Sequence, residues 1–597
     1  MQVRMRLLLA FLFTVLVVFT GRLMVLQLVR TEEYALRSLQ NAMAQQRITP
    51  LRGRIVARDG TVLADDRVAH DLMYRGGDAP EWERIKALLG LDTDLRPPDR
   101  NKPEELMNGS VAAWNIPDEL VAAVEERVAG SPNLYLRQRI ERTYPTNLAA
   151  QVVGYTQQAD PVRNPGYSVN DLVGIAGIEA AYEASLFGSA GSRQVEVDSA
   201  GRVVASHVMW TAQPGYDVVL TIDPQLQRLA EDVLQRSLTY VNEDRLRVGL
   251  PTEQVAKGAI IAMDPRTGEV LAMASSPSYD QNVFTHRPSD PEAVAAILQN
   301  RDLPLQNRAV EAYPPASTFK VVTSSTLLEE GYATANQRFP CSAAFRFGGI
   351  TWRNWATFDK GMYDVRNAIA DSCNTYYWYA AFNTPDFSRG WAPFIADLVE
   401  RARLLGFGRP TGVGLLEEKA GLIPDEQWVR ANMNQGWVPG FTLNTVIGQG
   451  DVLATPIQIA QFISTIANRG VMPKPYLVRQ IGNQEMEPQL TEVPGSHWKT
   501  LIEGMELMFT AYPSANTMGP RVYPWTVAGK TGTAQTQRGG DWTHAWFMGF
   551  SPVEEPEIAL VVFIEYGGSS SRVSVPVARD FLVGYWELKG MEVQASR

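Results

Sequence analysis

Thiol and imidazole groups are scarce in this sequence, which has two cysteines and five histidines in 597 residues. Protein sites for transition metals usually need several such ligands at short spacing, and the histidines are too scattered to supply them. The net charge of −10 provides no broad basic surface to meet phosphates. No phosphate-binding loop or dinucleotide fingerprint is present either. We therefore expect no metal, no cofactor and no nucleic-acid partner.

The two cysteines, Cys341 and Cys373, leave one question open. They can form a disulfide if this part of the chain faces an oxidising compartment. Their spacing along the sequence does not decide between a disulfide and two thiols.

Long apolar runs are also rare, and only residues 7–29 can cross a membrane. As a helix they span about 35 Å, enough for a bilayer core. Arg4 and Arg6 precede the run, which predicts a short cytoplasmic tail at 1–6. A cleaved signal peptide is the alternative, but no small-residue cleavage site follows the run. We predict a single-pass protein of the cell (inner) membrane with its remaining domains on the extracytoplasmic side.

Residues 30–212 are polar and mixed in pattern, and we interpret them as a pedestal. Arg-Asp-Gly at 58–60 lies between two alternating runs, which predicts a β-hairpin. A Pro-rich stretch at about 66–150 is interpreted as an inserted head lobe. We predict a helical stalk at 31–46, further helices at 81–89, 118–128 and 177–188, and strands at 192–197 and 203–208.

A turn signal at 213–216 marks the start of a second domain, which we place at 213–597. Asp223 and Pro224 then begin a long helix, with Asp223 as its cap. The pattern predicts strands at 218–222, 259–263, 269–274, 526–528, 545–550 and 558–564, and a closing helix at 577–586. This order indicates an α+β fold, with an antiparallel sheet flanked by helices and built from both ends of the domain.

Pro314 and Pro315 end one segment, and an apolar run with helical spacing follows them. Ser317 therefore lies near a helix N-terminus, where free N–H groups and the helix dipole favour developing negative charge. Lys320 lies one turn away on the same face. The two are a candidate nucleophile and base, provided that burial or nearby cations lower the pKa of the amine. Taken alone, this pattern also fits an ordinary helix cap.

Two further short motifs follow Ser317. The Ser-Cys-Asn motif at 372–374 precedes an apolar helix, and alone it fits a turn or cap equally well. The Lys-Thr-Gly-Thr motif at 530–533 ends a predicted strand, where Gly532 lets a substrate backbone come close. An edge strand protected by a lysine is the alternative there. Neither structural interpretation explains why all three motifs occur together in this order.

The set Ser-x-x-Lys, Ser-x-Asn and Lys-Thr-Gly is shared by penicillin-binding proteins and class A β-lactamases. The chain resembles the class B penicillin-binding proteins, monofunctional D,D-transpeptidases that cross-link peptidoglycan, and is most similar to their elongation-type group, penicillin-binding protein 2. The resemblance implies the serine transpeptidase fold on an elongated pedestal. It also covers Arg52-Gly-Arg-Ile, Arg142-Thr-Tyr-Pro, Gly177-Ile-Glu, Asp264-Pro-Arg-Thr-Gly, Ile447-Gly-Gln-Gly and His544-Ala-Trp-Phe.

The resemblance implies roles for the residues of the first two motifs. Ser317 would attack the carbonyl of the penultimate D-Ala in a stem peptide that ends in D-Ala-D-Ala. Lys320 would take the proton of Ser317, and Ser372 would relay one to the departing D-Ala. Asn374 would hydrogen-bond the substrate backbone and Lys320. β-Lactams mimic the same amide and would acylate Ser317.

The third motif would bind and polarise the substrate. Lys530 and Thr531 would hold the terminal carboxylate, while Gly532 leaves room for the substrate beside the strand. The positive charge of Lys530 would also help Lys320 to stay neutral. The N–H groups of Ser317 and Thr533 would form the oxyanion hole.

The chain departs from the family pattern in two places. Ala316 stands where the family usually has Gly before the nucleophile, and we expect only a small local change. Some elongation-type relatives carry a zinc site of Asp, His and Cys near the second motif. Here Lys360 stands where the His is expected, so we predict no zinc site.

Three alternatives to an elongation enzyme remain in view. The first is a division-specific transpeptidase of the same class. The second is a serine β-lactamase, which the long anchored N-terminal region and the lack of a Glu-x-x-Leu-Asn segment disfavour. The third is a non-catalytic β-lactam sensor or scaffold. The resemblance also implies a membrane partner, a polytopic glycosyltransferase of the shape, elongation, division and sporulation (SEDS) family, RodA-like.

Overall fold

The computed structural model describes residues 2–25, 43–102, 105, 109–169, 171–197, 203–382, 392–511 and 525–591. Contacts between residues divide the chain into two compact units. The smaller unit comprises Met1–Arg52 and Phe187–Gly215, and the larger unit comprises Gly53–Leu186 and Tyr216–Arg597.

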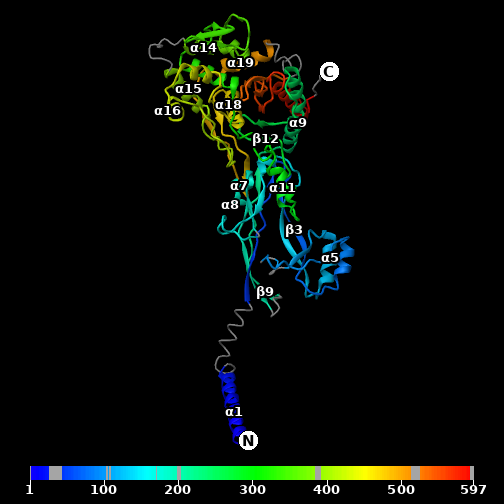
Figure 1. Ribbon diagram of the computed structural model, residues 1–597. Coiled ribbons are helices and arrows are strands. Elements are labelled where there is room, and N and C mark those ends of the chain that lie inside the picture. The colour runs from blue at the N-terminus through cyan, green and yellow to red at the C-terminus, as the bar shows by residue number, and fades with distance from the viewer. Residues whose placement is uncertain are drawn as a thin grey trace. The chain divides into compact units, whose positions relative to one another are not determined.

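The smaller unit contains helix α1 (Gln2–Met24) and an antiparallel sheet in the order β1-β8-β9 (Figure 1). Its strands are β1 (Met43–Ile48), β8 (Gly191–Val197) and β9 (Val203–Trp210). The two strands predicted at 192–197 and 203–208 are therefore confirmed. The helical stalk predicted at 31–46 is wrong at its C-terminal end, because 43–46 pair with β8 as a strand. Residues 31–42 lie outside the described residues.

Helix α1 covers most of the predicted anchor at 7–29, whose last residues, 26–29, lie outside the described residues. Apolar side chains of α1, such as Phe11, Leu16 and Phe19, are more than half exposed. Within the described part of the chain, no helix meets the length and apolarity needed to cross a membrane.

A seven-stranded sheet in the larger unit joins segments that are far apart in sequence. Its order is β19-β18-β10-β2-β3-β4, with β5 also paired to β3. The predicted hairpin at 58–60 is confirmed, because β2 and β3 are antiparallel on either side of it. The strands are β2 (Ile55–Val56), β3 (Val62–Tyr74), β4 (Ser110–Ala113), β5 (Leu134–Thr143), β10 (Val218–Leu220), β18 (Val478–Ile481) and β19 (Gln484–Glu485).

The region predicted as a head lobe has a small apolar core of its own, in which Leu72, Ile85 and Val124 are fully buried. Helices α3 (Trp82–Leu89) and α5 (Asp118–Val128) confirm the two helices predicted there. The single helix predicted at 177–188 is wrong. The chain forms two short helices instead, α7 (Gly177–Ala181) and α8 (Glu183–Leu186), because the backbone of Tyr182 leaves the helical region between them.

A five-stranded antiparallel sheet in the order β12-β11-β23-β22-β21 forms the other half of the larger unit. Its strands are β11 (Gly258–Met263), β12 (Val270–Ser276), β21 (Ala528–Ala534), β22 (His544–Ser551) and β23 (Ile558–Ile564). Two strands precede the helical region and three follow it, which confirms that the sheet is built from both ends of the domain. The strand predicted at 218–222 is not part of it, because β10 pairs with β2 and β18 in the seven-stranded sheet. Strand β21 lies at the edge, so its outer side is not occupied by another strand of this sheet.

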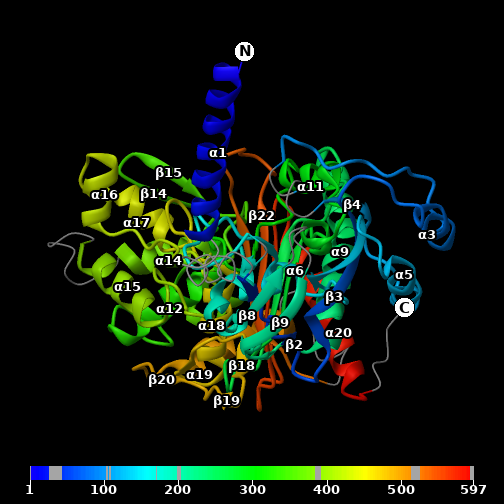
Figure 2. The ribbon, with the colours of Figure 1, turned by 90° about the horizontal axis from the view of Figure 1, so that it is seen from below.

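Both faces of this sheet are covered by helices. Alternate residues of β11 point to opposite faces, and every one of them is buried. Ile260 and Ala262 pack with α9 (Pro224–Val248) and α20 (Ser574–Leu588), whereas Ile261 belongs to the core formed with the other helices. Figure 2 shows α9 and α20 on one side of β22 and α12 and α15 on the other.

The helical region between the two groups of strands carries two of the three motifs. Asp223 caps α9 as predicted, accepting hydrogen bonds from the N–H groups of Gln225 and Leu226. Helix α9 precedes β11. The helices of the region after β12 are α10 (Asn282–Thr285), α11 (Pro291–Leu298), α12 (Lys320–Glu329), α13 (Val365–Ala370), α14 (Asn374–Phe382), α15 (Ala392–Leu404), α16 (Glu426–Met433), α17 (Pro439–Thr445), α18 (Pro456–Ala467) and α19 (Trp498–Ala511).

Candidate active site

The segment that carries Ser317 is a sharp turn into a helix. Residues 316–318 form one turn of 3-10 helix, and α12 begins at Lys320. Ala316 has a φ of 50°, a left-handed conformation that costs a residue other than glycine about 1 kcal/mol. Its N–H donates to the carbonyl of Gly448 at 2.8 Å, which helps to hold the turn. Position 316, where the family usually has glycine, therefore requires a positive φ although this chain has alanine there.

Lys320 brings the first two motifs together. Its Nζ is fully buried and donates to the carbonyl of Ser372 at 2.8 Å and to Asn374 Oδ1 at 2.5 Å. The hydroxyl of Ser372 lies 3.3 Å from the same nitrogen. Burial, followed by the nearby charge of Lys530, lowers the pKa of Lys320 well below its usual value. The lowered pKa favours the neutral amine, which is the form that a base needs.

The third motif lies on the edge strand β21. Lys530 is fully buried, and burial lowers its pKa to about 7. Its Nζ donates to the carbonyl of Thr531 at 2.9 Å. Thr533 is exposed, and its hydroxyl lies 2.9 Å from that of Ser570. The Nε2 of Gln449 donates to the carbonyl of Thr533 at 3.3 Å.

Gly532 lets β21 approach the nucleophile segment. A Cβ at this position would lie 2.9 Å from the carbonyl oxygen of Pro315 and 3.2 Å from Thr318 Cγ2. The sequence predicted that this glycine makes room for a substrate backbone. The structure adds a different reason, since the close neighbour is the turn that carries Ser317. The first and third motifs are thus in direct contact.

The second motif starts from another strained residue. Ser372 has a φ of 55° and lies between the end of α13 and the start of α14. Cys373 forms a disulfide with Cys341, which answers the question that the sequence left open. The two cysteines are 32 residues apart, and closing a loop of that size stabilises the fold by roughly 3–4 kcal/mol in the chain-entropy model.

The structure therefore brings Lys320, Ser372 and Asn374 into one hydrogen-bonded group and places Gly532 against the turn of Ser317. Ser317 is half-buried, and its hydroxyl makes no hydrogen bond to another described residue. Two residues that contact Thr533 of the third motif were not identified as site residues from the sequence. Gln449 was seen only as part of a family segment, and Ser570 lies in a serine run that has no motif.

The residues near the second motif do not fit a zinc site. The sulfur of Cys373 is bonded to Cys341 and cannot act as a thiolate ligand. Lys360 Nζ lies 2.6 Å from Asp371 Oδ2 and places a cation where a metal ligand is expected. No cluster of three or more His, Cys, Asp or Glu side chains occurs among the described residues.

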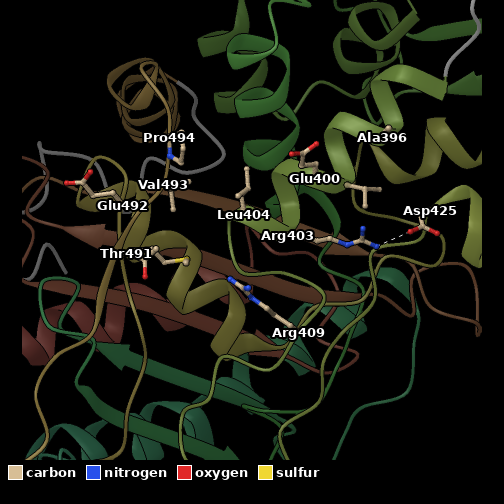
Figure 3. Close-up of a pocket in the computed structure, with 12 residues that line it drawn as sticks. Ala396, Glu400, Arg403, Leu404, Arg409, Asp425, Thr491, Glu492, Val493 and Pro494 are labelled. Atoms are coloured by element: carbon tan, nitrogen blue, oxygen red, sulfur yellow. Dashed lines mark hydrogen bonds and ion pairs between the residues drawn. The ribbon is translucent and has the colours of Figure 1, made fainter.

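A separate cavity of about 570 Å³ lies between α15 and residues 491–494 (Figure 3). Arg403, on one wall, points toward Asp425 and away from residues 491–494, and forms an ion pair with Asp425 at 2.9 Å. Its lining includes Ala396, Leu404 and Pro494 and none of the residues of the three motifs. We therefore locate the reaction by the motif residues and not by the size of a cavity.

The chain matches two family models. Residues 258–583 match the penicillin-binding protein transpeptidase domain, and residues 47–220 match the penicillin-binding protein dimerisation domain. The first match alone covers more than half of the chain and includes all three motifs.

Relatives match over nearly the whole length. The peptidoglycan D,D-transpeptidase MrdA of Acinetobacter baumannii is 29% identical, over 96% of this chain and 86% of that protein. A solved structure, described as "Structural coordination of polymerization and crosslinking by a peptidoglycan synthase complex", contains a chain that is 43% identical, with a TM-score of 0.80 and full coverage of both chains.

A further solved structure is that of penicillin-binding protein 2 of Pseudomonas aeruginosa in complex with WCK 5153. It is 28% identical, with a TM-score of 0.67, and the match covers 92% of this chain and 99% of that one. These likenesses cover at least 92% of this chain and so extend well beyond the domain that carries the motifs. The chain belongs to the class B penicillin-binding proteins, in the group of peptidoglycan D,D-transpeptidases that includes the MrdA proteins and penicillin-binding protein 2.

Proposed function

We propose that Ser317 is the nucleophile of the transpeptidase reaction and that Lys320 is its base. The observation that carries this proposal is the environment of Lys320, which is buried, bound to Ser372 and Asn374, and one turn from Ser317. Ser317 Oγ attacks the carbonyl carbon of the penultimate D-Ala, and Lys320 takes its proton. Ser372 passes a proton to the amine of the departing D-Ala, and the peptide becomes an ester on Ser317.

The remaining residues bind the substrate in this proposal. Lys530 and Thr531 hold the terminal carboxylate, and Asn374 holds the substrate backbone. Gly532 keeps β21 close to the turn, so that the N–H groups of Ser317 and Thr533 can both point at the oxyanion. The amine of a second stem peptide then attacks the ester, which forms the cross-link and frees Ser317.

Labelling with a fluorescent penicillin tests the assignment of the nucleophile. The full-length wild type should be labelled, because a β-lactam ring presents the same acyl group to Ser317, and Ser317→Ala should not be. Ser289→Ala is a matched control, because Ser289 is exposed and belongs to none of the three motifs. Equal labelling of wild type and Ser317→Ala would overturn the assignment.

We also propose that residues 7–29 anchor the chain in the cell membrane, with 1–6 in the cytoplasm and the other domains outside it. The exposed apolar side chains of α1 support this proposal. The chain would then divide into a pedestal at 30–212, with a head lobe at about 66–150, and a transpeptidase domain at 213–597. Fractionation of cells that express a fusion protein tests it. Recovery of the full chain in the soluble fraction would contradict it.

We infer that the enzyme works with a SEDS-family glycosyltransferase during cell elongation. Support comes from the 43% identical relative, which was solved in a complex for polymerisation and cross-linking. Replacing residues 1–29 with an unrelated anchor should weaken stimulation of the polymerase. Unchanged stimulation would exclude an essential contact through the anchor. Depletion of the protein should give round cells, whereas filaments would point to a role in division.

A further inference from the structure

Cys373 lies between two residues that the proposed reaction uses, Ser372 and Asn374. Its disulfide ties this point of the chain to Cys341, at the end of the short strand β13 (Phe339–Pro340). Both cysteines are fully buried. A covalent bond therefore fixes the middle residue of the second motif to a neighbouring segment.

Asn354 adds a second connection at the same place. Its Oδ1 accepts a hydrogen bond from the N–H of Asn374 at 3.2 Å, and its Nδ2 donates to the carbonyl of Ser342 at 3.1 Å. The same Nδ2 lies 3.6 Å from the sulfur of Cys341 and 3.6 Å from that of Cys373. One buried amide thus joins the disulfide, the segment after Cys341 and the start of α14.

The segment around Cys341, to which the second motif is tied, is itself held in place by hydrogen bonds. The N–H of Cys341 donates to the carbonyl of Gly361 at 2.7 Å, and the N–H of Lys360 donates to the carbonyl of Cys341 at 2.8 Å. Lys360 also pairs with Asp371, the residue before Ser372, at 2.6 Å. Where some relatives use a metal near the second motif, this chain has a disulfide, an amide and an ion pair instead.

We propose that the Cys341–Cys373 disulfide and Asn354 form a clasp that positions Ser372 and Asn374 for acylation of Ser317. The clasp acts through these two residues and touches no substrate, so its members are positioning residues. The need for a clasp follows from the strained backbone of Ser372, whose φ of 55° the surrounding structure must maintain. This inference rests on the roles proposed above for Ser372 and Asn374.

The test compares the full-length protein in detergent with Cys341→Ala, the double variant Cys341→Ala/Cys373→Ala, and Asn354→Ala. Acylation by a fluorescent penicillin is followed in time at several concentrations, which separates the affinity from the acylation step. We expect the acylation step to fall by roughly tenfold or more in each variant, because small misplacements of reacting groups are costly. The affinity should change much less, and the acidic limb of the pH profile should move because Lys320 loses its fixed partners.

A matched control separates positioning from loss of stability. Leu134→Ala removes a fully buried side chain from the separate head-lobe core and should lower the melting temperature without slowing acylation. The inference is overturned if the double variant melts at a lower temperature but is acylated at the wild-type rate. It is equally overturned if Leu134→Ala slows acylation as much as the double variant does.

The same labelling experiment distinguishes failure of the clasp proposal from failure of the proposed reaction. If the oxidised wild type is not labelled, or if Ser317→Ala is labelled equally, the assignment of the nucleophile itself is wrong. If the wild type is labelled at Ser317 and the clasp variants behave normally, only the clasp is wrong.

Discussion

Lys320 and Lys530 are both fully buried, and the charge of Lys530 adds to the effect of burial in lowering the pKa of Lys320. The two amines have opposite requirements in the proposed reaction. Lys320 must be neutral to take a proton, whereas Lys530 must be charged to hold a carboxylate. Activity therefore requires a pH at which Lys320 has lost its proton and Lys530 still carries its own.

The first prediction is a bell-shaped pH profile for acylation of the free enzyme. The rate should rise with pH as Lys320 loses its proton and should fall above the pKa of Lys530, which is about 7. Stopped-flow labelling with a fluorescent penicillin between about pH 5 and pH 10 measures it. A rate that keeps rising to the top of this range would contradict the role given to Lys530.

The second prediction concerns stability. Above pH 7 the folded protein has largely released the proton of Lys530, whereas an unfolded lysine keeps its proton up to a pH of about 10. The unfolded state thus binds more protons, so the free energy of unfolding should rise with pH, by at most about 1.4 kcal/mol per pH unit for this group. Lys530→Met should remove this part of the slope. Parallel slopes for the two proteins, measured by chemical denaturation, would contradict the prediction.

The third prediction concerns the turn of Ser317. Gly448 has a φ of 68°, and a Cβ there would lie 2.2 Å from the carbonyl oxygen of Ala316 and 2.6 Å from Phe319 Cβ. Gly448→Ala should displace the turn and slow acylation by about 100-fold. Gly249→Ala is a matched control, because Gly249 has a φ of 76° and no atom within 4 Å of its added Cβ. Gly249→Ala should cause a similar backbone strain but leave the acylation rate unchanged. Equal rates for the two variants would contradict the contact.

The fourth prediction concerns the indole of Trp546, which is fully buried. Its Nε1 donates to the carbonyl of Pro314 at 2.9 Å, three residues before Ser317. Trp546→Phe leaves that carbonyl without its donor and should lower the free energy of unfolding by roughly 1–3 kcal/mol. It should also slow acylation by about tenfold through the turn.

Trp586→Phe is the control for the loss of an indole N–H. The Nε1 of Trp586 is buried and has no hydrogen-bond partner among the described residues, so its loss leaves no acceptor unsatisfied. Acylation should stay at the wild-type rate. A larger effect of Trp586→Phe than of Trp546→Phe, in denaturation or in labelling, would show that packing and not the hydrogen bond matters.

The sequence predicted the strands of the central sheet because their apolar runs and turn residues are local signals. The position of Lys320 one turn after Ser317 was equally predictable, since it depends only on helix geometry. What could not be predicted was how the motifs touch. The contact of Gly532 with Pro315 and the burial of Lys530 depend on strands and helices that are hundreds of residues apart.

The disulfide is a second feature that the sequence could not predict. Whether Cys341 meets Cys373 depends on the pairing of β13 with β16 (Met362–Tyr363), which short strands without clear alternation do not reveal. The helix predicted at 177–188 failed because the amphipathic pattern continues through Tyr182, where the backbone does not. The average hydrophobic pattern of a segment predicts a helix or a strand, whereas tertiary contacts decide where that helix or strand ends.

The mixed sheet of the larger unit has a consequence for biosynthesis. Strand β10 pairs on one side with β2, made early, and on the other with β18, residues 478–481, made late. While the chain is being synthesised, one edge of β10 stays unpaired and can pair with strands of other chains. The sheet as a whole can therefore be completed only when most of the domain with the motifs has been synthesised. A chain that ends before β18 should therefore keep an exposed edge on β10 and be prone to aggregation.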